Sequence, residues 1–332
     1  MKAGTVRSMV AASQLPPIRL SPSSLILHLF MPPSPATADV QPASAARRVG
    51  LLAGWGRYPL LIAEALRQQG CRVYALGVAG LADPRLGELC EDFQWVGLAR
   101  FGAAIRYFQR HAVTEATMAG KVHKVLLFQP WRWLRHVPDL RTVRMFLPHF
   151  LTRRDDCRDD TLLGVIVREF ADCGIRFAPA TDYAPQLLVG PGQLTRRGPS
   201  PAQWKDIAFG WRMAKEMGRL DIGQTVAVKD QAVLAVEAVE GTDECIRRAG
   251  TLCRLGGFAV VKVAKPRQDM RFDVPTVGPG TVETLATAGG RVLAVEAGRT
   301  ILLDASQALA LADRRGLAIV AIKDGEDSGL GS

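Results

Sequence analysis

The sequence predicts an α/β protein of two α/β domains: a Rossmann-like first domain with a mostly parallel sheet, and a smaller second domain of mixed α/β structure. Three observations lead to this prediction. The length of 332 residues allows two domains of ordinary size. Short apolar runs alternate with segments of helical periodicity, the order typical of βαβ units. A stretch rich in proline and glycine interrupts this alternation near the middle of the chain.

The predicted boundaries follow from these changes in composition. Residues 1–46 are rich in proline, serine and alanine, and we expect a disordered leader. The first domain is then expected at 47–180 and a linker at 181–200. The second domain is expected at 201–324, followed by a flexible tail at 325–332.

The first domain is expected to open with a βαβ unit. Val49–Ala53 is an apolar run typical of a buried strand, the helix Leu60–Gln69 follows a glycine-rich turn, and 72–77 is the next strand. Later elements are a helix near 101–111, a strand near 115–119, a helix at 161–172 and a strand at 175–178.

The second domain is expected to begin with a helix at 202–217. The strands expected after it are 225–228, 232–239, 258–263, 291–296, 300–304 and 317–322, and the helices are 244–248, 282–288 and 306–315.

Composition excludes several classes of protein. Hydrophobic residues make up 48% and charged residues 22%, which is normal for a soluble protein with well-formed cores. No run approaches the roughly 18 apolar residues of a membrane span. The six cysteines form no CxxC pair and the five histidines no HExxH motif, so a zinc site is not expected and a reducing cytoplasm fits best. The net charge of +10 suits nucleic acid, acidic lipid or a phosphorylated substrate without choosing among them.

Two turns of the first domain are candidates for ligand binding. Gly54-Trp55-Gly56 follows a strand and opens a helix, where backbone N–H groups can bind phosphate. The turn lacks the third glycine of a dinucleotide fingerprint, which argues against NAD. Gly120-Lys121 follows another strand of the same sheet, and ligands of open α/β sheets bind at strand carboxyl ends. A phosphate or sugar site and a plain tight turn both remain open.

The segment from Lys262 to Gly278 is the most informative of the chain. The cations Lys262, Lys265, Arg267 and Arg271 surround the carboxylates Asp269 and Asp273 on a loop that follows an apolar strand. Such a loop suits an anionic, phosphorylated ligand, and its carboxylates suit a divalent cation. A solvated loop of paired charges is the alternative.

Two turns of the second domain are ambiguous. Asp221 is either a site residue or a cap or ion-pair partner of Arg219. Thr242 and Asp243 follow Gly241, and this tripeptide is also a good turn and helix N-cap.

The stretch Phe128–Arg158 interleaves aromatic side chains with arginines. It is typical of nucleic-acid binding, of a helix lying on an anionic membrane, or of ordinary helices with one packed face.

Six motifs in order resemble the LpxI-type UDP-2,3-diacylglucosamine pyrophosphatases, over about Arg47 to Lys323. The motifs are Leu51–Pro59, Ala119–Val122, Asp159–Leu163, Gly218–Gln224, Val233–Asp243 and Lys265–Gly278. The resemblance implies Mg²⁺-dependent hydrolysis of UDP-2,3-diacylglucosamine to UMP and 2,3-diacylglucosamine 1-phosphate (lipid X), a step of lipid A synthesis. It also implies a cytoplasmic enzyme in peripheral contact with the inner membrane, and no nucleic-acid partner. A homodimer is a further expectation. Two alternative functions remain to be tested: a non-catalytic nucleotide-sugar or lipid-binding protein, and a basic nucleic-acid-binding protein.

The resemblance also implies roles for individual residues. The family's essential aspartate falls on Asp273, the expected catalytic residue. Our hypothesis for the Mg²⁺ ligands is Asp273, Asp243 and Asp221. Lys121 stands where some members have asparagine. The expected substrate-binding residues are Gly54, Trp55, Gly56, Lys121, Val122, Thr242, Asp243, Lys262, Lys265 and Arg271.

Overall fold

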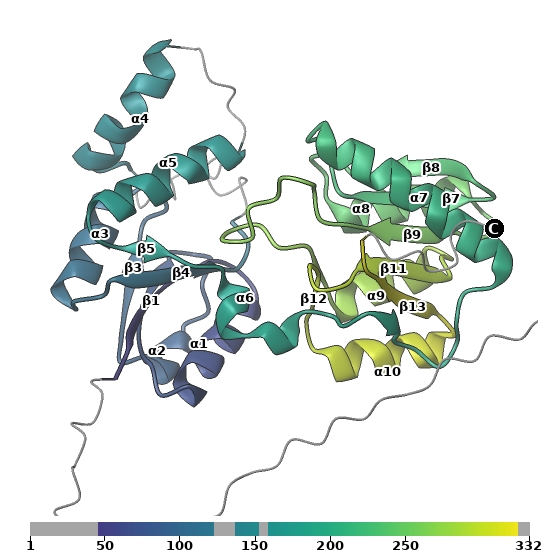
Figure 1. Cartoon of the computed structure of the whole chain (residues 1–332), viewed down its shortest axis with the longest axis horizontal. Coiled ribbons are helices and arrows are strands. Elements are labelled where there is room, and N and C mark those ends of the chain that lie inside the picture. The colour runs from purple at the N-terminus through teal and green to yellow at the C-terminus, as the bar shows by residue number, and fades with distance from the viewer. Residues whose placement is uncertain (1–45, 123–136, 153–158, 325–332) are drawn as a thin grey trace, which may run out of the picture. The chain divides into compact units, whose positions relative to one another are not determined.

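The computed structural model describes residues 46–122, 137–152 and 159–324 (Figure 1). The predicted leader and tail, and much of the aromatic and basic stretch, lie outside these residues. Within the described part of the chain, no helix is long and apolar enough to cross a membrane.

The first domain is built on a five-stranded sheet of order β3-β2-β1-β4-β5 in which every neighbouring pair is parallel. This confirms the predicted Rossmann-like sheet. The strands are β1 (Arg48–Ala53), β2 (Arg72–Val78), β3 (Asp92–Val96), β4 (Glu115–Ala119) and β5 (Arg176–Phe177).

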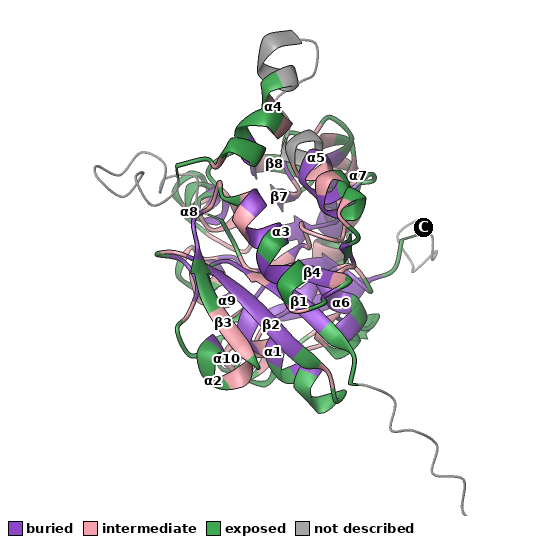
Figure 2. Cartoon of the chain, turned by 90° about the vertical axis from the view of Figure 1, so that its left-hand side faces the viewer, coloured by how far each residue is buried: buried purple, intermediate pink, exposed green. Residues whose placement is uncertain are grey.

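Helices cover both faces of this sheet. Side chains of α1 (Tyr58–Gln68), α2 (Leu86–Leu89) and α6 (Ala180–Tyr183) pack on one face in a core cluster that includes Leu51 and Ile62. Side chains of α3 (Phe101–Arg110) and α5 (Asp159–Asp172) pack on the other face in a cluster that includes Phe108 and Phe170. In Figure 2 the central strands are accordingly buried along most of their length, and the outer faces of the helices are exposed.

The second domain has a mixed six-stranded sheet of order β6-β13-β11-β9-β7-β8. Strands β13, β11 and β9 are parallel, whereas β6, β7 and β8 join by antiparallel pairing. The strands are β6 (Gly192–Gln193), β7 (Thr225–Lys229), β8 (Ala232–Val236), β9 (Ala259–Lys262), β11 (Val292–Glu296) and β13 (Ala318–Ile322). A separate parallel pair joins β10 (Thr276–Val277) to β12 (Ile301–Leu302).

One long helix covers one face of this sheet and three shorter helices cover the other. The long helix α7 (Pro201–Arg219) begins with a capping box, in which the Ser200 hydroxyl accepts from the Gln203 N–H and the Gln203 side chain accepts from the Ser200 N–H. The opposite face packs α8 (Thr242–Leu252), α9 (Pro279–Thr287) and α10 (Ala305–Arg315).

Several predicted elements differ from those observed. The strand expected at 232–239 ends at Val236, and the strand expected at 300–304 has two residues and pairs outside the main sheet. The helix expected at 244–248 runs from Thr242 to Leu252. The linker expected at 181–200 contains the short helix Pro185–Leu187 and also β6, which pairs with the edge of the second sheet. The helix α4 (Leu140–Thr152) lies in the aromatic and basic stretch, for which helices with one packed face were one of three interpretations.

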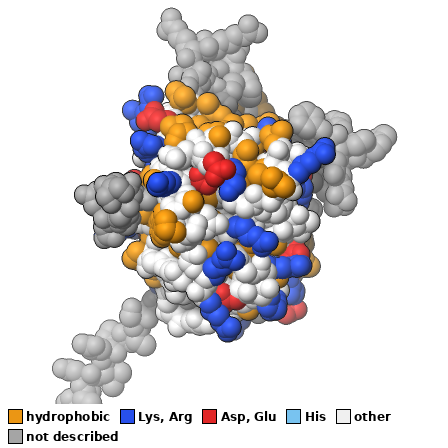
Figure 3. Space-filling model, turned by 90° about the vertical axis from the view of Figure 1, so that its right-hand side faces the viewer, with side chains coloured by type: hydrophobic (Ala, Val, Ile, Leu, Met, Phe, Trp, Pro, Cys, Tyr) orange, Lys and Arg blue, Asp and Glu red, His pale blue; other side chains and the backbone are white. Residues whose placement is uncertain are grey.

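Surface charges are dispersed over the face shown in Figure 3. Basic side chains lie there in small groups, with acidic and uncharged side chains between them. Several surface arginines are paired with acids, as in Arg247 with Glu244 and Arg315 with Glu283. The basic side chains on this face therefore do not form the continuous stripe that is typical of nucleic-acid-binding surfaces.

Candidate active site

The two turns singled out in the first domain lie against each other. Strand β1 pairs with β2 on one side and with β4 on the other, so the strand order reverses between β1 and β4. The Trp55 N–H donates to the Lys121 carbonyl at 2.8 Å and the Lys121 N–H donates to the Trp55 carbonyl at 2.9 Å. Both turns thus stand at the carboxyl ends of parallel strands at a topological switch point, the usual ligand position in such sheets.

Glycine is required in these turns by the close approach of their backbones. A Cβ on Gly54 would lie 2.7 Å from the Lys121 carbonyl oxygen. Gly120 has φ +93°, and a Cβ there would lie 2.8 Å from the Gly54 carbonyl carbon. Gly56 also has positive φ, but nothing lies within 4 Å of its Cβ position, so the backbone there faces open space at the start of α1.

Apolar side chains beside these turns face solvent. Trp55 is 51% exposed and Val122 is 47% exposed. Lys121, which directly precedes Val122, is also exposed. Val122 follows Lys121, which pairs with Trp55, so the two apolar side chains flank one contact between the turns. This half of the site offers backbone N–H groups, one cation and apolar contact area.

The second half of the site lies at the carboxyl end of β9. Lys262, the last residue of the strand, is only 4% exposed, and its Nζ donates to the Thr242 hydroxyl at 2.6 Å. That hydroxyl in turn donates to Glu237 Oε1 at 2.9 Å. Burial lowers the pKa of Lys262, while the nearby carboxylates of Glu237, Asp273 and Asp243 act in the opposite direction. The strand end therefore holds a buried cation beside three acids.

The loop after β9 positions Asp273 beside this lysine. The Lys265 N–H donates to Gln268 Oε1 at 2.7 Å, and the Gln268 amide donates to Asp273 Oδ2 at 2.5 Å. Burial raises the pKa of Asp273, and the charges of Lys265 and Lys262 oppose that rise. At the start of the loop, the buried carboxylate of Glu296 accepts from the Ala264 N–H at 2.7 Å.

Two other acids of this region, Asp269 and Asp221, are engaged in ion pairs. Arg271 binds Asp269 through two nitrogens at 2.5–3.0 Å, which lowers the pKa of Asp269. Lys265 Nζ lies 2.6 Å from Asp221 Oδ1, so the alternative in which Asp221 pairs with Arg219 is wrong. Arg219 pairs with Glu216 instead.

Asp273 differs from these acids. Among the described residues, no positively charged nitrogen lies within 4.0 Å of the Asp273 carboxylate, so it forms no ion pair. The paired-charge interpretation of this segment therefore holds for Asp269 and Arg271 but not for Asp273.

Three buried acceptor atoms near Lys262 have no hydrogen-bond partner among the residues that the structure describes. They are Gln224 Oε1, Glu237 Oε2 and Asp243 Oδ1. Buried acceptors without partners are uncommon, and here they lie in the same region as the acids that act on Lys262. Sequence reasoning named Asp243 but missed Gln224 and Glu237. An acid directly after the apolar residues of β8 was the available signal for Glu237.

The side chains fit a magnesium ion held by fewer protein ligands than expected. No group of three acidic, histidine or cysteine side chains that could hold a metal is present among the described residues. Asp221, Asp243 and Asp273 are therefore not brought together, and Asp221 is paired with Lys265. Among the described residues, Asp243 has an unsatisfied oxygen and Asp273 has no ion pair. Mg²⁺ is commonly held by one or two carboxylates together with substrate phosphates and water. Asp273 and Asp243 fit that description.

Comparisons with known proteins cover nearly the whole described chain. The family model for the LpxI N-terminal domain matches residues 48–187, and that for the LpxI C-terminal domain matches residues 190–320. The chain is 31% identical over 252 residues to the UDP-2,3-diacylglucosamine pyrophosphatase LpxI of Caulobacter vibrioides. The matched region spans 73% of this chain and 86% of the relative.

Proposed function

Because the chain belongs to the LpxI family, we propose that it is a UDP-2,3-diacylglucosamine pyrophosphatase of lipid A synthesis. Its products would be UMP and 2,3-diacylglucosamine 1-phosphate. The observation that carries the proposal is the environment of Asp273. This carboxylate has a raised pKa, forms no ion pair with any described residue, and lies close to two lysines at the end of a strand. Such an unpaired acid beside cations suits the hydrolysis of a phosphoanhydride.

Lysines and aspartates of the second domain would carry out the chemistry. We propose that Asp273 and Asp243 hold Mg²⁺, which when bound polarises a phosphoryl oxygen and neutralises the departing phosphate. Lys262 and Lys265 would bind the oxygens of the pyrophosphate and stabilise the charge that develops on them. Arg271 would contribute its positive charge beside them, reduced by its pairing with Asp269.

The first domain would bind the same substrate through its glycine turns. Backbone N–H groups at Gly56 and the start of α1 suit phosphate oxygens, because they carry the positive end of the helix dipole. Lys121 adds a positive charge, and the exposed rings and methyl groups of Trp55 and Val122 offer apolar contact.

We further propose that the enzyme acts in the cytoplasm and touches the inner membrane through α4. The inner side of α4 packs on the first domain, since Met145 and Phe146 contact its core and the Thr142 hydroxyl accepts from the Phe101 N–H. The outer side presents Leu140, 86% exposed, and Leu147, 47% exposed. A helix with an exposed apolar side and arginines beside it is typical of proteins that lie on anionic membranes.

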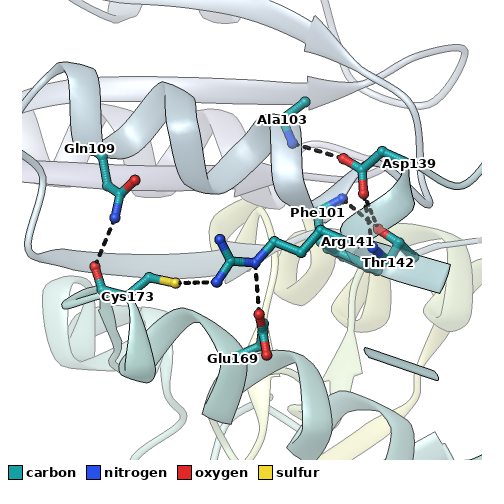
Figure 4. A network of polar contacts seen from close by, with 8 residues as sticks. All are labelled: Phe101, Ala103, Gln109, Asp139, Arg141, Thr142, Glu169 and Cys173. Atoms are coloured by element: carbon teal, nitrogen blue, oxygen red, sulfur yellow. Dashed lines mark hydrogen bonds and ion pairs between the residues drawn. The ribbon is translucent and has the colours of Figure 1, made fainter. Parts of the chain in front are cut away.

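Polar contacts fix α4 to its neighbours, as Figure 4 shows. Asp139 accepts from the Thr142 N–H at the start of α4 and from the Ala103 N–H of α3, both at 2.9 Å. Arg141 donates to Glu169 of α5 at 2.7 Å and to the Cys173 sulfur. The exposed side of α4 is therefore held in one orientation relative to α3 and α5.

Vesicle binding tests the membrane contact. We expect the protein to sediment with anionic vesicles and the double variant Leu140→Glu/Leu147→Glu to remain in the supernatant. Leu252, 63% exposed on α8, provides the matched control Leu252→Glu, which should sediment like the wild type. Equal sedimentation of the double variant and the wild type would refute the role of α4.

UMP release tests the enzymatic function. Purified protein mixed with UDP-2,3-diacylglucosamine and Mg²⁺ should release UMP and 2,3-diacylglucosamine 1-phosphate, and EDTA should stop the reaction. Tight substrate binding without UMP release would instead show a binding protein of the same fold.

A further inference from the structure

A buried lysine without a direct acidic partner is the starting observation. Lys262 is 4% exposed, and its Nζ donates to the neutral hydroxyl of Thr242. In the described part of the chain, no carboxylate comes within 4.0 Å of this nitrogen. Lys215 provides the contrast, because its Nζ lies 2.9 Å from both oxygens of the buried Glu296. The charge of Lys262 is thus held in place without being neutralised by contact.

The hydrogen bonds around Thr242 have a defined direction. A hydroxyl has one hydrogen, and that hydrogen is donated to Glu237 Oε1 at 2.9 Å. The lone pairs of the Thr242 oxygen are then directed toward Lys262, from which it accepts at 2.6 Å. An ammonium group has three hydrogens, so this contact leaves others for a ligand.

Glu237 is itself fixed by the neighbouring backbone. It is 7% exposed, and its N–H donates to the Thr225 carbonyl at 2.8 Å. Gly223 packs so closely that a Cβ there would lie 2.0 Å from the Glu237 carbonyl oxygen. Thr225 is also the residue paired with Lys262 across β7 and β9. Both ends of the Glu237–Thr242–Lys262 network therefore lie against Thr225 of β7.

From this geometry we propose that Glu237 is a positioning residue for the reaction. Through the Thr242 hydroxyl it fixes the Lys262 ammonium at the carboxyl end of β9, where that ammonium binds phosphate oxygens of the substrate. The proposal rests on the proposed function and names a residue that acts without touching the substrate.

Unsatisfied atoms at the network itself support this role. Among the described residues, Glu237 Oε2 and Asp243 Oδ1 are buried without partners. A polar network that serves stability alone is expected to satisfy its members, because each unpartnered buried acceptor costs about 1–3 kcal/mol. Lys215 and Glu296 form such a satisfied pair in the same domain. The unpartnered oxygen of Glu237, by contrast, lies close to the carboxyl end of β9, beside the acids of the candidate site.

A double-mutant cycle between Glu237 and Lys262 tests the proposal. We expect Glu237→Leu to lower kcat for UMP release about tenfold or more while KM changes less than about threefold, because the fixed ammonium acts mainly on the transition state. In a Lys262→Met background the same substitution should change kcat less than about twofold, since its effect passes through the lysine. Glu237→Gln keeps an oxygen acceptor for Thr242 and should recover most of the lost rate.

Two further variants keep the test decisive if Glu237→Leu does not fold. Thr242→Val removes the link and should lower kcat similarly, again with little effect in the Lys262→Met background. Thr300→Val is the matched control and should retain wild-type kcat. Thr300 is fully buried, and its hydroxyl has no partner in the described part of the chain.

The possible results separate this proposal from the proposed function. UMP release by the wild type with additive effects of Glu237→Leu and Lys262→Met, or with no rescue by Glu237→Gln, would overturn the positioning role alone. Absence of UMP release from the wild type would overturn the proposed function and the positioning role together.

Discussion

Replacing Gly120 by alanine is predicted to disrupt the contact between the two glycine turns of the first domain. The residue has φ +93°, and a Cβ there would lie 2.8 Å from both the Gly54 carbonyl carbon and the Trp55 carbonyl oxygen. Both neighbours are backbone atoms, so they cannot move aside by a side-chain rotation. The alanine should therefore push apart the turns joined by Trp55 and Lys121.

The expected cost follows from these contacts. A left-handed backbone costs about 1–2 kcal/mol for a residue with a Cβ. Separating the turns also removes two backbone hydrogen bonds between Trp55 and Lys121, each with a net value of about 1 kcal/mol. Gly120→Ala should thus lower the free energy of unfolding by about 3–4 kcal/mol. Gly70→Ala is the matched control: Gly70 has φ +75° but nothing within 4 Å of its Cβ position, so its cost should be only about 1–2 kcal/mol.

Urea unfolding of the two variants measures the difference. We expect Gly120→Ala to be less stable than Gly70→Ala by about 2 kcal/mol, and to show a raised KM for the substrate. Equal losses of stability in the two variants would refute the interpretation that these turns require backbone contact.

Two further predictions concern acids of the second domain. Glu296→Gln should lower the free energy of unfolding by about 2–4 kcal/mol, because it removes the charge that pairs with Lys215 at a fully buried position. A decrease of less than about 1 kcal/mol, measured by urea unfolding, would contradict this. Burial raises the pKa of Asp273. Between the ordinary aspartate pKa and the raised one, the folded protein therefore retains a proton that the unfolded chain has released. The free energy of unfolding should fall as the pH rises through this range. Asp273→Asn should remove this fall and, measured in EDTA, be more stable than the wild type at pH 7; a less stable variant would show that the carboxylate is favoured by its surroundings.

The elements that could be predicted from the sequence are those with a clear pattern of burial, such as a strand buried on both faces. Strand β1 and helix α1 were recognised because β1 is buried on both faces and α1 has one apolar side. Strand β3, Asp92–Val96, was missed because it is an edge strand with polar and partly exposed residues, which gives no clear periodicity. The two-residue strand β10 is too short to produce any pattern, and β12 was predicted only as a longer strand at 300–304.

The candidate site was predictable in its residue types but not in its pairings. Asp269 and Asp273 look equivalent in the sequence, and only the structure shows that Arg271 pairs with the first and not the second. The pairing of Asp221 with Lys265 joins residues 44 positions apart, which no local pattern reveals. Glu237 accepts from the Thr242 hydroxyl only five residues further along the chain, but Thr242 meets Lys262 only in the folded domain.

The most direct test of the account compares two aspartates of one loop. The rates of UMP release from UDP-2,3-diacylglucosamine should be measured for Asp273→Asn and Asp269→Asn in Mg²⁺. Asp273→Asn should lower kcat by about 10²–10³-fold or more while the protein remains folded, and Asp269→Asn should stay within about tenfold of the wild type. Near wild-type turnover by Asp273→Asn would contradict the assignment of catalysis to this carboxylate.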